Sequence, residues 1–144
     1  MKERGIERID LVVSDALQGI ENAVCAAFPQ AAQFCVAHVK RQILGCVSHK
    51  DKPAVAQELG EVFSLENKEM KSLQGYEHFI TFVTKWEKKY PTLRRYKAER
   101  NAAYFTYMDF PIEVQSAYTT TNRIERLNRK YKRSVSMRTS MPSD

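Results

Sequence analysis

Apolar residues in the first third of the chain alternate between short runs and helical stripes. The β-branched run at residues 9–14 is typical of a strand buried on both faces, and residues 32–37 form a second strand-like run. Apolar positions recur at helical spacing across residues 17–28, where Pro29 marks the stop, and again across residues 39–47. The order strand, helix, strand, helix predicts a right-handed parallel unit.

Beyond Pro53 the pattern becomes helical alone. Residues 55–63 carry one apolar stripe, and residues 76–90 carry an aromatic-rich one at spacings of three and four. The aromatic stripe favours core packing over the alternative of a base-stacking platform. Residues 101–110 fit either a helix or an irregular, aromatic-rich connection, and a last helix is expected from Asn122 onwards.

Composition agrees with one globular domain. The chain has 144 residues, of which 43% are hydrophobic and 28% charged, and it is long enough to form one core. We therefore predict a single α/β, mostly helical domain over residues 1–144. No apolar run reaches the roughly 18 residues of a membrane span, and the charged N-terminus lacks the apolar stretch of a signal peptide. These features predict a cytoplasmic protein without membrane contact, whose three cysteines stay reduced.

Positive charge is concentrated towards the C-terminus. The formal net charge of +6 favours an anionic partner. Between residues 123 and 138 the only acid is Glu125. Such a cluster can neutralise several phosphates of a nucleic acid, although it also fits a solvated helix face that happens to be basic. The residues expected to contact nucleic acid are Arg123, Arg126, Arg129, Lys130, Lys132 and Arg133.

Asp15 directly follows the first predicted strand. Ligands and metals usually bind at the carboxyl edge of a parallel sheet, so this position suits a metal ligand. Asp15 with Gln18 three residues later also fits a helix N-cap, and the local sequence favours capping. Asp10 lies five residues earlier in the same predicted strand. The odd spacing directs it to the opposite face, so the two acids are not expected to share a metal.

Glu125 leaves two similar interpretations open. The segment from Asn122 to Glu125 has the spacing of a capping box, and a carboxylate there would stabilise a helix start. A single acid among cations is equally the pattern of a metal-binding carboxylate in a groove for DNA. In that case the cations would hold phosphates while the acid holds the ion.

Two Cys-x-x-His pairs, Cys35 with His38 and Cys46 with His49, raise the question of a zinc site. If the chain between the pairs is helical, a rise of about 1.5 Å per residue separates them by roughly 12 Å, too far to share an ion. Zinc bound by all four side chains is therefore disfavoured. His38 is expected near the same sheet edge as Asp15, and a packed or hydrogen-bonded histidine is the interpretation that its local sequence favours.

Several segments together resemble the Mutator-type transposase family, the bacterial insertion-sequence branch of enzymes with a ribonuclease-H-like core and an Asp, Asp, Glu triad. The resemblance covers most of the chain. Each segment is a weak signal alone, and their order and spacing make the match specific. The segments are residues 12–20 (VVSDALQGI), 28–29 (FP), 34–42 (FCVAHVKRQ), 86–91 (WEKKYP), 110–111 (FP) and 120–129 (TTNRIERLNR).

The resemblance implies a reaction and a site. Position by position, it makes Asp15 the second acid of the triad and Glu125 the third, and it matches Cys35 and His38 to the family's Cys-x-x-His signature, whose role stays open. In the intact enzyme the triad would hold two divalent ions, Mg²⁺ or Mn²⁺, about 3.5 to 4 Å apart, for DNA cleavage and strand transfer at transposon ends. Arg123, Arg126 and Arg129 would clamp DNA phosphates. Capping and catalysis can coexist at both acids.

The same resemblance divides the chain into three parts. It implies a truncated ribonuclease-H-like core of two parallel strands at residues 1–50, an all-helical insertion at 51–117, and a basic, glutamate-bearing helix with a tail at 118–144. The family's first aspartate belongs to an earlier strand, and this chain starts too late to contain it. We therefore expect an interior fragment, associated with the nucleoid, that binds DNA but cleaves none alone. Its truncated sheet would leave an unpaired strand edge, which favours a homodimer.

Two hypotheses from other classes stay open. One is a noncatalytic helical nucleic-acid-binding module that uses the basic terminal helix. The other is a helical interaction domain without a nucleic-acid role, which would show no salt-dependent binding to DNA. The transposase interpretation requires that the carboxyl groups of Asp15 and Glu125 meet at one rim of the partial sheet.

Overall fold

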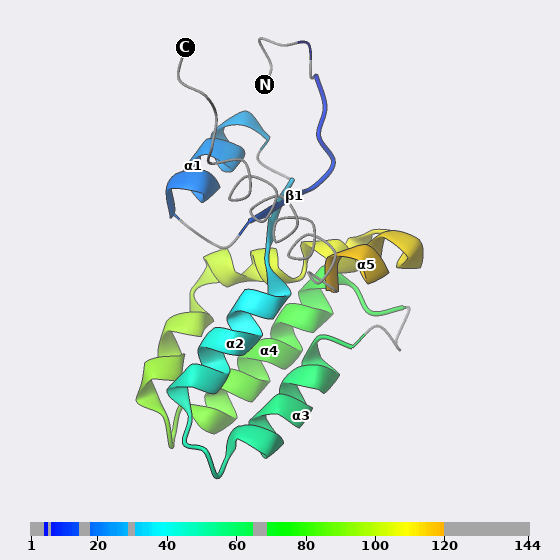
Figure 1. The fold of residues 1–144 in the computed structure, drawn as a ribbon. Helices are drawn as coiled ribbons and strands as arrows, with labels where there is room; N and C mark the ends of the chain where they lie inside the picture. The colour runs from blue at the N-terminus through cyan, green and yellow to red at the C-terminus, as the bar shows by residue number, and fades with distance from the viewer. Residues whose placement is uncertain (1–4, 6, 15–17, 29–30, 65–68, 120–144) are drawn as a thin grey trace, which may run out of the picture.

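The computed structural model describes residues 5, 7–14, 18–28, 31–64 and 69–119. A small sheet and one helix form one end of the molecule, and a body of helices forms the rest (Figure 1). The α-helices and strands, together with the 3₁₀-helices η2 to η4, follow the order β1 (Val12–Ser14), α1 (Gln18–Ala27), β2 (Ala32–Phe34), α2 (Val36–Cys46), α3 (Lys52–Val62), α4 (Ser72–Trp86), η2 (Pro91–Lys97), η3 (Glu99–Tyr104), η4 (Thr106–Asp109) and α5 (Ile112–Thr119). Among the described residues, no helix is long and apolar enough to cross a membrane.

The sheet is a parallel pair of strands joined through α1. Val12 lies opposite Ala32, and Ser14 lies opposite Phe34. This confirms the parallel strand, helix, strand order that the hydrophobic pattern predicted. The chain is thus an α/β protein in which helices predominate.

Both strands are shorter than predicted. β1 begins at Val12 because its partner strand β2 begins at Ala32, which lies opposite Val12. Ala31, just before β2, donates its N–H to the carbonyl of Phe28 at 3.0 Å. Asp10 therefore lies outside the strand, exposed, with its carboxylate 2.6 Å from Nε of Arg8. Placing Asp10 within the strand was wrong, and so was full burial of the strand, because β1 is only half-buried.

The second strand ends at Phe34 rather than at residue 37. Residues from Val36 onwards already belong to α2, so the apolar run contains a strand, a one-residue joint and a helix start. Apolar runs of this length cannot be divided by periodicity alone. The run nonetheless stays buried throughout most of its length, since it lies between the sheet and the helical body.

The helical part agrees with the predicted stripes. α1 and α3 match the predicted segments to within three residues at each end. α4 starts earlier than the stripe at residues 76–90 and ends at Trp86, so Tyr90 lies beyond it, and α2 starts earlier than the stripe at residues 39–47 indicated. Residues 91–109 form the three 3₁₀-helices, so the open alternative at residues 101–110 resolves into short helical turns. α5 was not predicted, and the helix expected from Asn122 lies outside the described residues.

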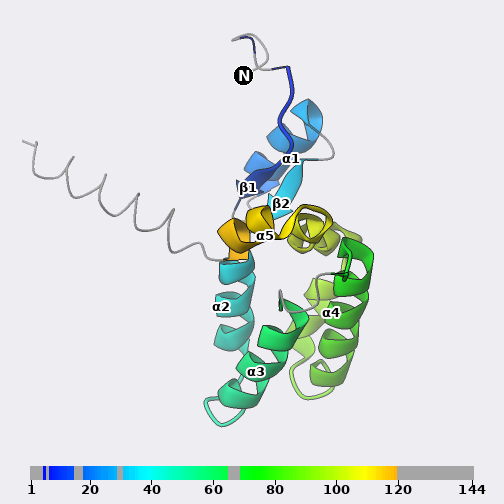
Figure 2. The same cartoon turned by 90° about the vertical axis from the view of Figure 1, so that its right-hand side faces the viewer.

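α2, α3 and α4 run side by side, and η2 to η4 fold back across them (Figures 1 and 2). Aromatic rings fill the interior: Phe63 stacks on Phe105 with ring centroids 4.9 Å apart, and Phe79 meets Phe105 at 5.6 Å. Phe79 and Val83 are fully buried. The aromatic stripe of residues 76–90 is thus core, as the spacing favoured, rather than a stacking platform.

Gly75 lies where α4 packs closely against Phe105 and η4. A Cβ atom built at this position would lie 2.5 Å from Sδ of Met108 and 2.7 Å from a ring carbon of Phe105. Gly60 in α3 and Gly45 in α2 have no atom within 4 Å of the same hypothetical Cβ. Only Gly75, of these three, is required by packing.

We predict opposite effects for two glycine-to-alanine changes. Gly75→Ala forces buried side chains apart and should destabilise the fold by about 1–3 kcal/mol, as overpacking does. Gly60→Ala removes backbone entropy from the unfolded chain without a clash and should stabilise it by about 0.5–1 kcal/mol. Urea unfolding midpoints of both variants measure the difference. Equal or reversed shifts would contradict the close packing of α4 on η4.

Candidate functional site at the sheet edge

The carboxyl ends of the two strands lie side by side. Ser14, the last residue of β1, is opposite Phe34, the last residue of β2. One residue further, the N–H of Cys35 donates to the carbonyl of Ser14 at 2.7 Å. Cys35 is also the N-cap residue of α2. This bond therefore joins the strand end that precedes Asp15 to the start of the Cys-x-x-His segment.

The two predicted catalytic acids, Asp15 and Glu125, lie outside the described residues. The structure follows the backbone towards Asp15 as far as Ser14. The meeting of the two carboxyl groups at one rim stays a prediction, and so does the DNA contact of the basic residues. Those basic residues, also outside the described part, are Arg123, Arg126, Arg129, Lys130, Lys132 and Arg133.

Cys35 and His38 lie at the sheet end of α2, as expected. Cys35 is buried and His38 is half-buried in the first turn of the helix. Cys46 and His49 lie at the other end of α2, whose 11 residues span about 16 Å. Among the described residues, no group of three or more His, Cys, Asp or Glu side chains could hold a metal ion. The two Cys-x-x-His pairs thus lie at opposite ends of one helix, the arrangement on which the sequence argument against a shared zinc ion was based.

A buried amide that the sequence analysis did not single out anchors the sheet edge. Gln33 is 1% exposed, and its Nε2 donates to the carbonyls of Phe34 at 2.6 Å and Tyr104 at 3.0 Å. Its Oε1 accepts the N–H of Tyr107 at 2.8 Å. One side chain therefore connects β2 to η3 and η4. The available signal was a polar residue inside an otherwise apolar strand run.

The outer edge of β2 is also covered. The backbone bonds to β1 use the carbonyl of Ala31, so by the alternation of a strand the carbonyls of Ala32 and Phe34 point away from β1. The Thr106 hydroxyl donates to Ala32 at 3.0 Å, and the Gln33 amide donates to Phe34. Both carbonyls on the outer side of β2 thus have donors among the described residues.

The segment WEKKYP, one of those that carry the family resemblance, has a packing role in the helical body. Nε1 of Trp86 donates to Glu58 at 3.0 Å and so connects α4 to α3. Glu87 accepts Nζ of Lys97 at 2.7 Å, and this hydrogen bond holds the pKa of the Glu87 carboxyl below its usual value. These contacts fix the turn between α4 and η2.

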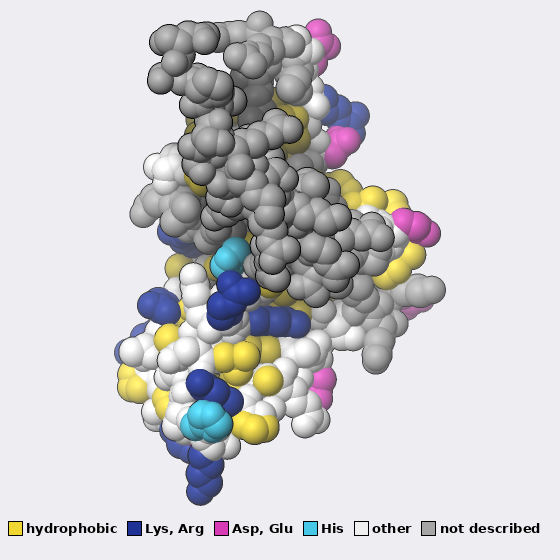
Figure 3. All heavy atoms as spheres, viewed as in Figure 1, with side chains coloured by type: hydrophobic (Ala, Val, Ile, Leu, Met, Phe, Trp, Pro, Cys, Tyr) yellow, Lys and Arg dark blue, Asp and Glu magenta, His cyan; other side chains and the backbone are white. Residues whose placement is uncertain are grey.

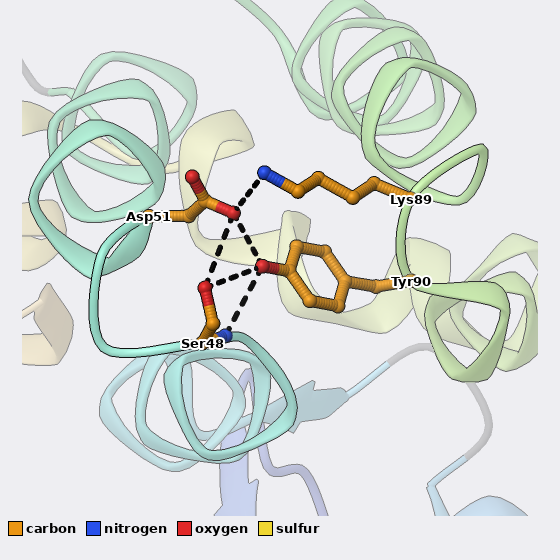
Figure 4. Close-up of polar contacts among 4 residues, drawn as sticks. All are labelled: Ser48, Asp51, Lys89 and Tyr90. Atoms are coloured by element: carbon orange, nitrogen blue, oxygen red, sulfur yellow. Dashed lines mark hydrogen bonds and ion pairs between the residues drawn. The ribbon is translucent and has the colours of Figure 1, made fainter.

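A polar cluster closes the end of the body that lies away from the sheet. Figure 4 shows Ser48 and Asp51, from the turn between α2 and α3, facing Lys89 and Tyr90 from the turn after α4. The Tyr90 hydroxyl accepts the N–H of Ser48 at 3.2 Å and donates to the Asp51 carboxylate. Nζ of Lys89 lies 2.6 Å from the same carboxylate. Hydrogen bonds from Lys89 and then Tyr90 hold the pKa of Asp51 below its usual value.

Comparisons with known proteins find the same family along the whole chain. Residues 1–144 match the family described as Transposase, Mutator family. The chain is 33% identical over 147 residues to the transposase for insertion sequence element ISRM3 of Rhizobium meliloti, covering 100% of this chain and 36% of that protein. It is 28% identical to the transposases for IS905 of Lactococcus lactis and IS1201 of Lactobacillus helveticus, again across 100% of the chain. It spans 36% and 38% of the length of those two relatives.

We predict that Gln33→Glu destabilises the fold in a pH-dependent way. A carboxylate can accept the N–H of Tyr107 but cannot donate to the two carbonyls, and an unsatisfied buried group costs about 1–3 kcal/mol. Burial raises the folded-state pKa of the new carboxyl, so its cost grows as pH rises above the unfolded value of about 4.3. Urea unfolding should show a larger deficit at pH 7 than at pH 4.5.

The matched control for that change is Gln74→Glu. Oε1 of Gln74 accepts the N–H of Lys71 at 3.1 Å in the first turn of α4, where a carboxylate accepts equally well. This control should keep or gain stability at pH 7. Wild-type stability of the Gln33→Glu variant at both pH values would mean that the amide does not join the sheet to the body.

We predict that the Asp51 cluster stabilises the fold only while Asp51 is charged. Since its folded pKa is lowered, its contribution is complete above the unfolded value of about 3.9 and is lost as pH falls through the lower folded value. Asp51→Asn should therefore lower the melting temperature at pH 7, and the gap to wild type should narrow towards pH 2. Lys89→Gln should also lower the melting temperature at pH 7, and its gap to wild type should likewise narrow towards pH 2. A gap independent of pH would contradict the ion pair as its cause.

Proposed function

Since this chain belongs to the Mutator family of transposases, we propose that it supplies part of the metal-dependent centre with which such an enzyme cleaves DNA and transfers strands at insertion-sequence ends. Asp15 and Glu125 are the two carboxylates we assign to that centre, as the second and third acids of an Asp, Asp, Glu triad. The observation that carries the proposal is the bond from Cys35 to Ser14, at the strand end that immediately precedes Asp15.

The position of this strand end supports a ligand site. β1 and β2 are parallel, and ligands bind outside the carboxyl ends of parallel strands. We propose that the pair is part of a ribonuclease-H-like core and that α3, α4 and η2 to η4 form its helical insertion. Residues 1–50, 51–117 and 118–144 are then the core part, the insertion and the glutamate-bearing part of one domain.

The donor chemistry of the two acids fits a hard cation. Mg²⁺ and Mn²⁺ prefer carboxylate oxygens as ligands, whereas softer metal ions prefer thiolates. Such an ion, when bound, would activate the attacking oxygen and stabilise the leaving one. Asp15 and Glu125 would hold it and fix its position relative to the scissile phosphate.

Cys35 and His38 are assigned a positioning role. The N–H of Cys35 holds the carbonyl of Ser14 and so sets the direction in which the chain leaves β1. His38 lies in the first turn of α2, three residues after Cys35. Burial of Cys35 makes the thiol a packed side chain rather than an exposed nucleophile.

The basic residues near Glu125 would bind the DNA backbone. Arg123, Arg126 and Arg129 would clamp phosphates beside the scissile bond, and Lys130, Lys132 and Arg133 would extend that contact. Contacts of this kind position a duplex without reading its sequence. The resemblance assigns no residue of this chain to the first aspartate of the triad, so we propose that the chain alone binds DNA but cleaves none.

We predict that Glu125→Gln abolishes strand transfer in a protein lengthened upstream to carry the first aspartate. Loss of a metal carboxylate removes several kcal/mol of transition-state stabilisation, or on the order of a thousandfold in rate. DNA affinity should stay unchanged or rise, because a negative charge is removed. Cleavage and joining of labelled transposon-end DNA in Mg²⁺ or Mn²⁺ measure the first effect, and fluorescence anisotropy measures the second.

Glu77→Gln is the matched control, because Glu77 is exposed on α4 in the helical body. It should retain both strand transfer and DNA binding. Strand transfer at the wild-type rate by the Glu125→Gln protein would remove Glu125 from the centre. A lengthened protein that binds DNA in proportion to its charge and never cleaves it would instead indicate the noncatalytic nucleic-acid-binding module.

A further inference from the structure

A second concentration of positive charge lies within the helical body. Between Lys85 and Arg100 the chain carries seven Lys and Arg residues against two Glu. This stretch forms the end of α4, the turn after it, η2 and the start of η3. It is separate in sequence from the basic cluster around Glu125.

Tertiary contacts gather several of these side chains at the end of the body that lies away from the sheet. Lys89 reaches Asp51 on the turn between α2 and α3, and Nη2 of Arg95 lies 3.5 Å from Sγ of Cys46 at the end of α2. Figure 3 shows Lys and Arg over the lower end, the left side and the middle of the body, with Asp or Glu at its right edge. We define the distal basic surface as Lys50, Lys88, Lys89, Arg94 and Arg95.

The acids beside this surface are already engaged. Asp51 is held by Lys89 and Tyr90, and Glu87 is held by Lys97, with Nε of Arg94 further away at 3.7 Å. Arg94 nevertheless exposes 76% of its side chain. Lys50 and Lys88 are exposed as well. The surface therefore presents cations outward.

One of the arginines is held in a fixed orientation. The guanidinium of Arg95 lies over the ring of Tyr96, 5.0 Å from its centroid, and donates to the Tyr96 hydroxyl at 3.1 Å. Tyr96 itself is buried, and its hydroxyl donates to Gln42 of α2 at 3.3 Å. A cation ordered in this way loses less conformational entropy on binding an anion.

We propose that the distal basic surface binds the phosphate backbone of duplex DNA that extends away from the sheet edge. This rests on the proposed function, which places the reacting DNA at that edge. α2 separates the two places by about 16 Å, a length along which duplex DNA carries roughly ten phosphates over about five base pairs. The described large apolar side chains that are exposed, Ile20 and Leu73, lie elsewhere, so the surface lacks the apolar centre typical of protein interfaces.

The test compares two double variants of the full chain that remove equal charge. Lys88→Gln with Arg94→Gln changes the distal basic surface, whereas Arg8→Gln with Lys71→Gln changes exposed cations on the first strand's approach and at the start of α4. Anisotropy of a labelled 25-base-pair duplex of arbitrary sequence is measured across a salt series. Urea unfolding confirms that both variants fold.

The first variant should bind DNA on the order of tenfold or more weakly at 0.1 M salt, with a slope of log affinity against log salt smaller by about 1.8, since each lost phosphate contact contributes about 0.9. The control should lose less than about twofold. Lys88→Arg with Arg94→Lys should restore both values, because phosphate binding needs the charge.

Equal losses in the two double variants would overturn the distal basic surface, and so would absence of salt-dependent binding by the wild-type chain. These binding results do not change the loss of strand transfer expected from Glu125→Gln. That assay tests the proposed function separately. If Glu125→Gln retains strand transfer while the first double variant still loses affinity selectively, the surface stands and the assigned catalytic role fails.

Discussion

The buried amide of Gln33 is the contact on which the relation between sheet and helical body depends. Two hydrogen bonds of this side chain connect β2 to the backbone of η3 and η4, and a third stays within β2 at the carbonyl of Phe34. These partners are buried carbonyls and an N–H, so no water can replace the amide without opening the core. Tyr104 and Tyr107, more than seventy residues further along the chain, therefore help to fix the position of β2 and of the sheet edge that precedes Asp15.

The helical body supports a different proposed site at each of its two ends. At one end, Cys35 holds the carbonyl of Ser14 and ties α2 to the strand that precedes the predicted catalytic acid. At the other end, contacts of Asp51 with Lys89 and Tyr90 join the turn between α2 and α3 to the turn after α4, which leads into η2 and Arg94. α2 runs between them, so one rigid helix sets the spacing between the proposed centre and the proposed DNA surface.

Local pattern predicted the parallel unit and the helical stripes because hydrophobic periodicity reports which face of an element is buried. It misjudged the strand ends, because a strand extends only as far as its partner, and β1 and β2 pair only between Val12 and Ser14 and between Ala32 and Phe34. The segment at residues 101–110 was left open between a helix and an irregular connection, since the burial of its rings depends on side chains contributed by α3 and α4. α5 was missed for lack of a strong stripe.

For the candidate site, the chain order of VVSD, CVAH, WEKKYP and NRIE was sufficient to indicate the family, because order and spacing are properties of the sequence. Within WEKKYP, the tertiary structure decided the roles of individual residues. Glu87 and Tyr90 serve packing because their partners, Lys97 and Asp51, come from other elements. Gln33 was not singled out from the sequence, because two of its hydrogen-bond partners, Tyr104 and Tyr107, lie more than seventy residues away and no local window contains them.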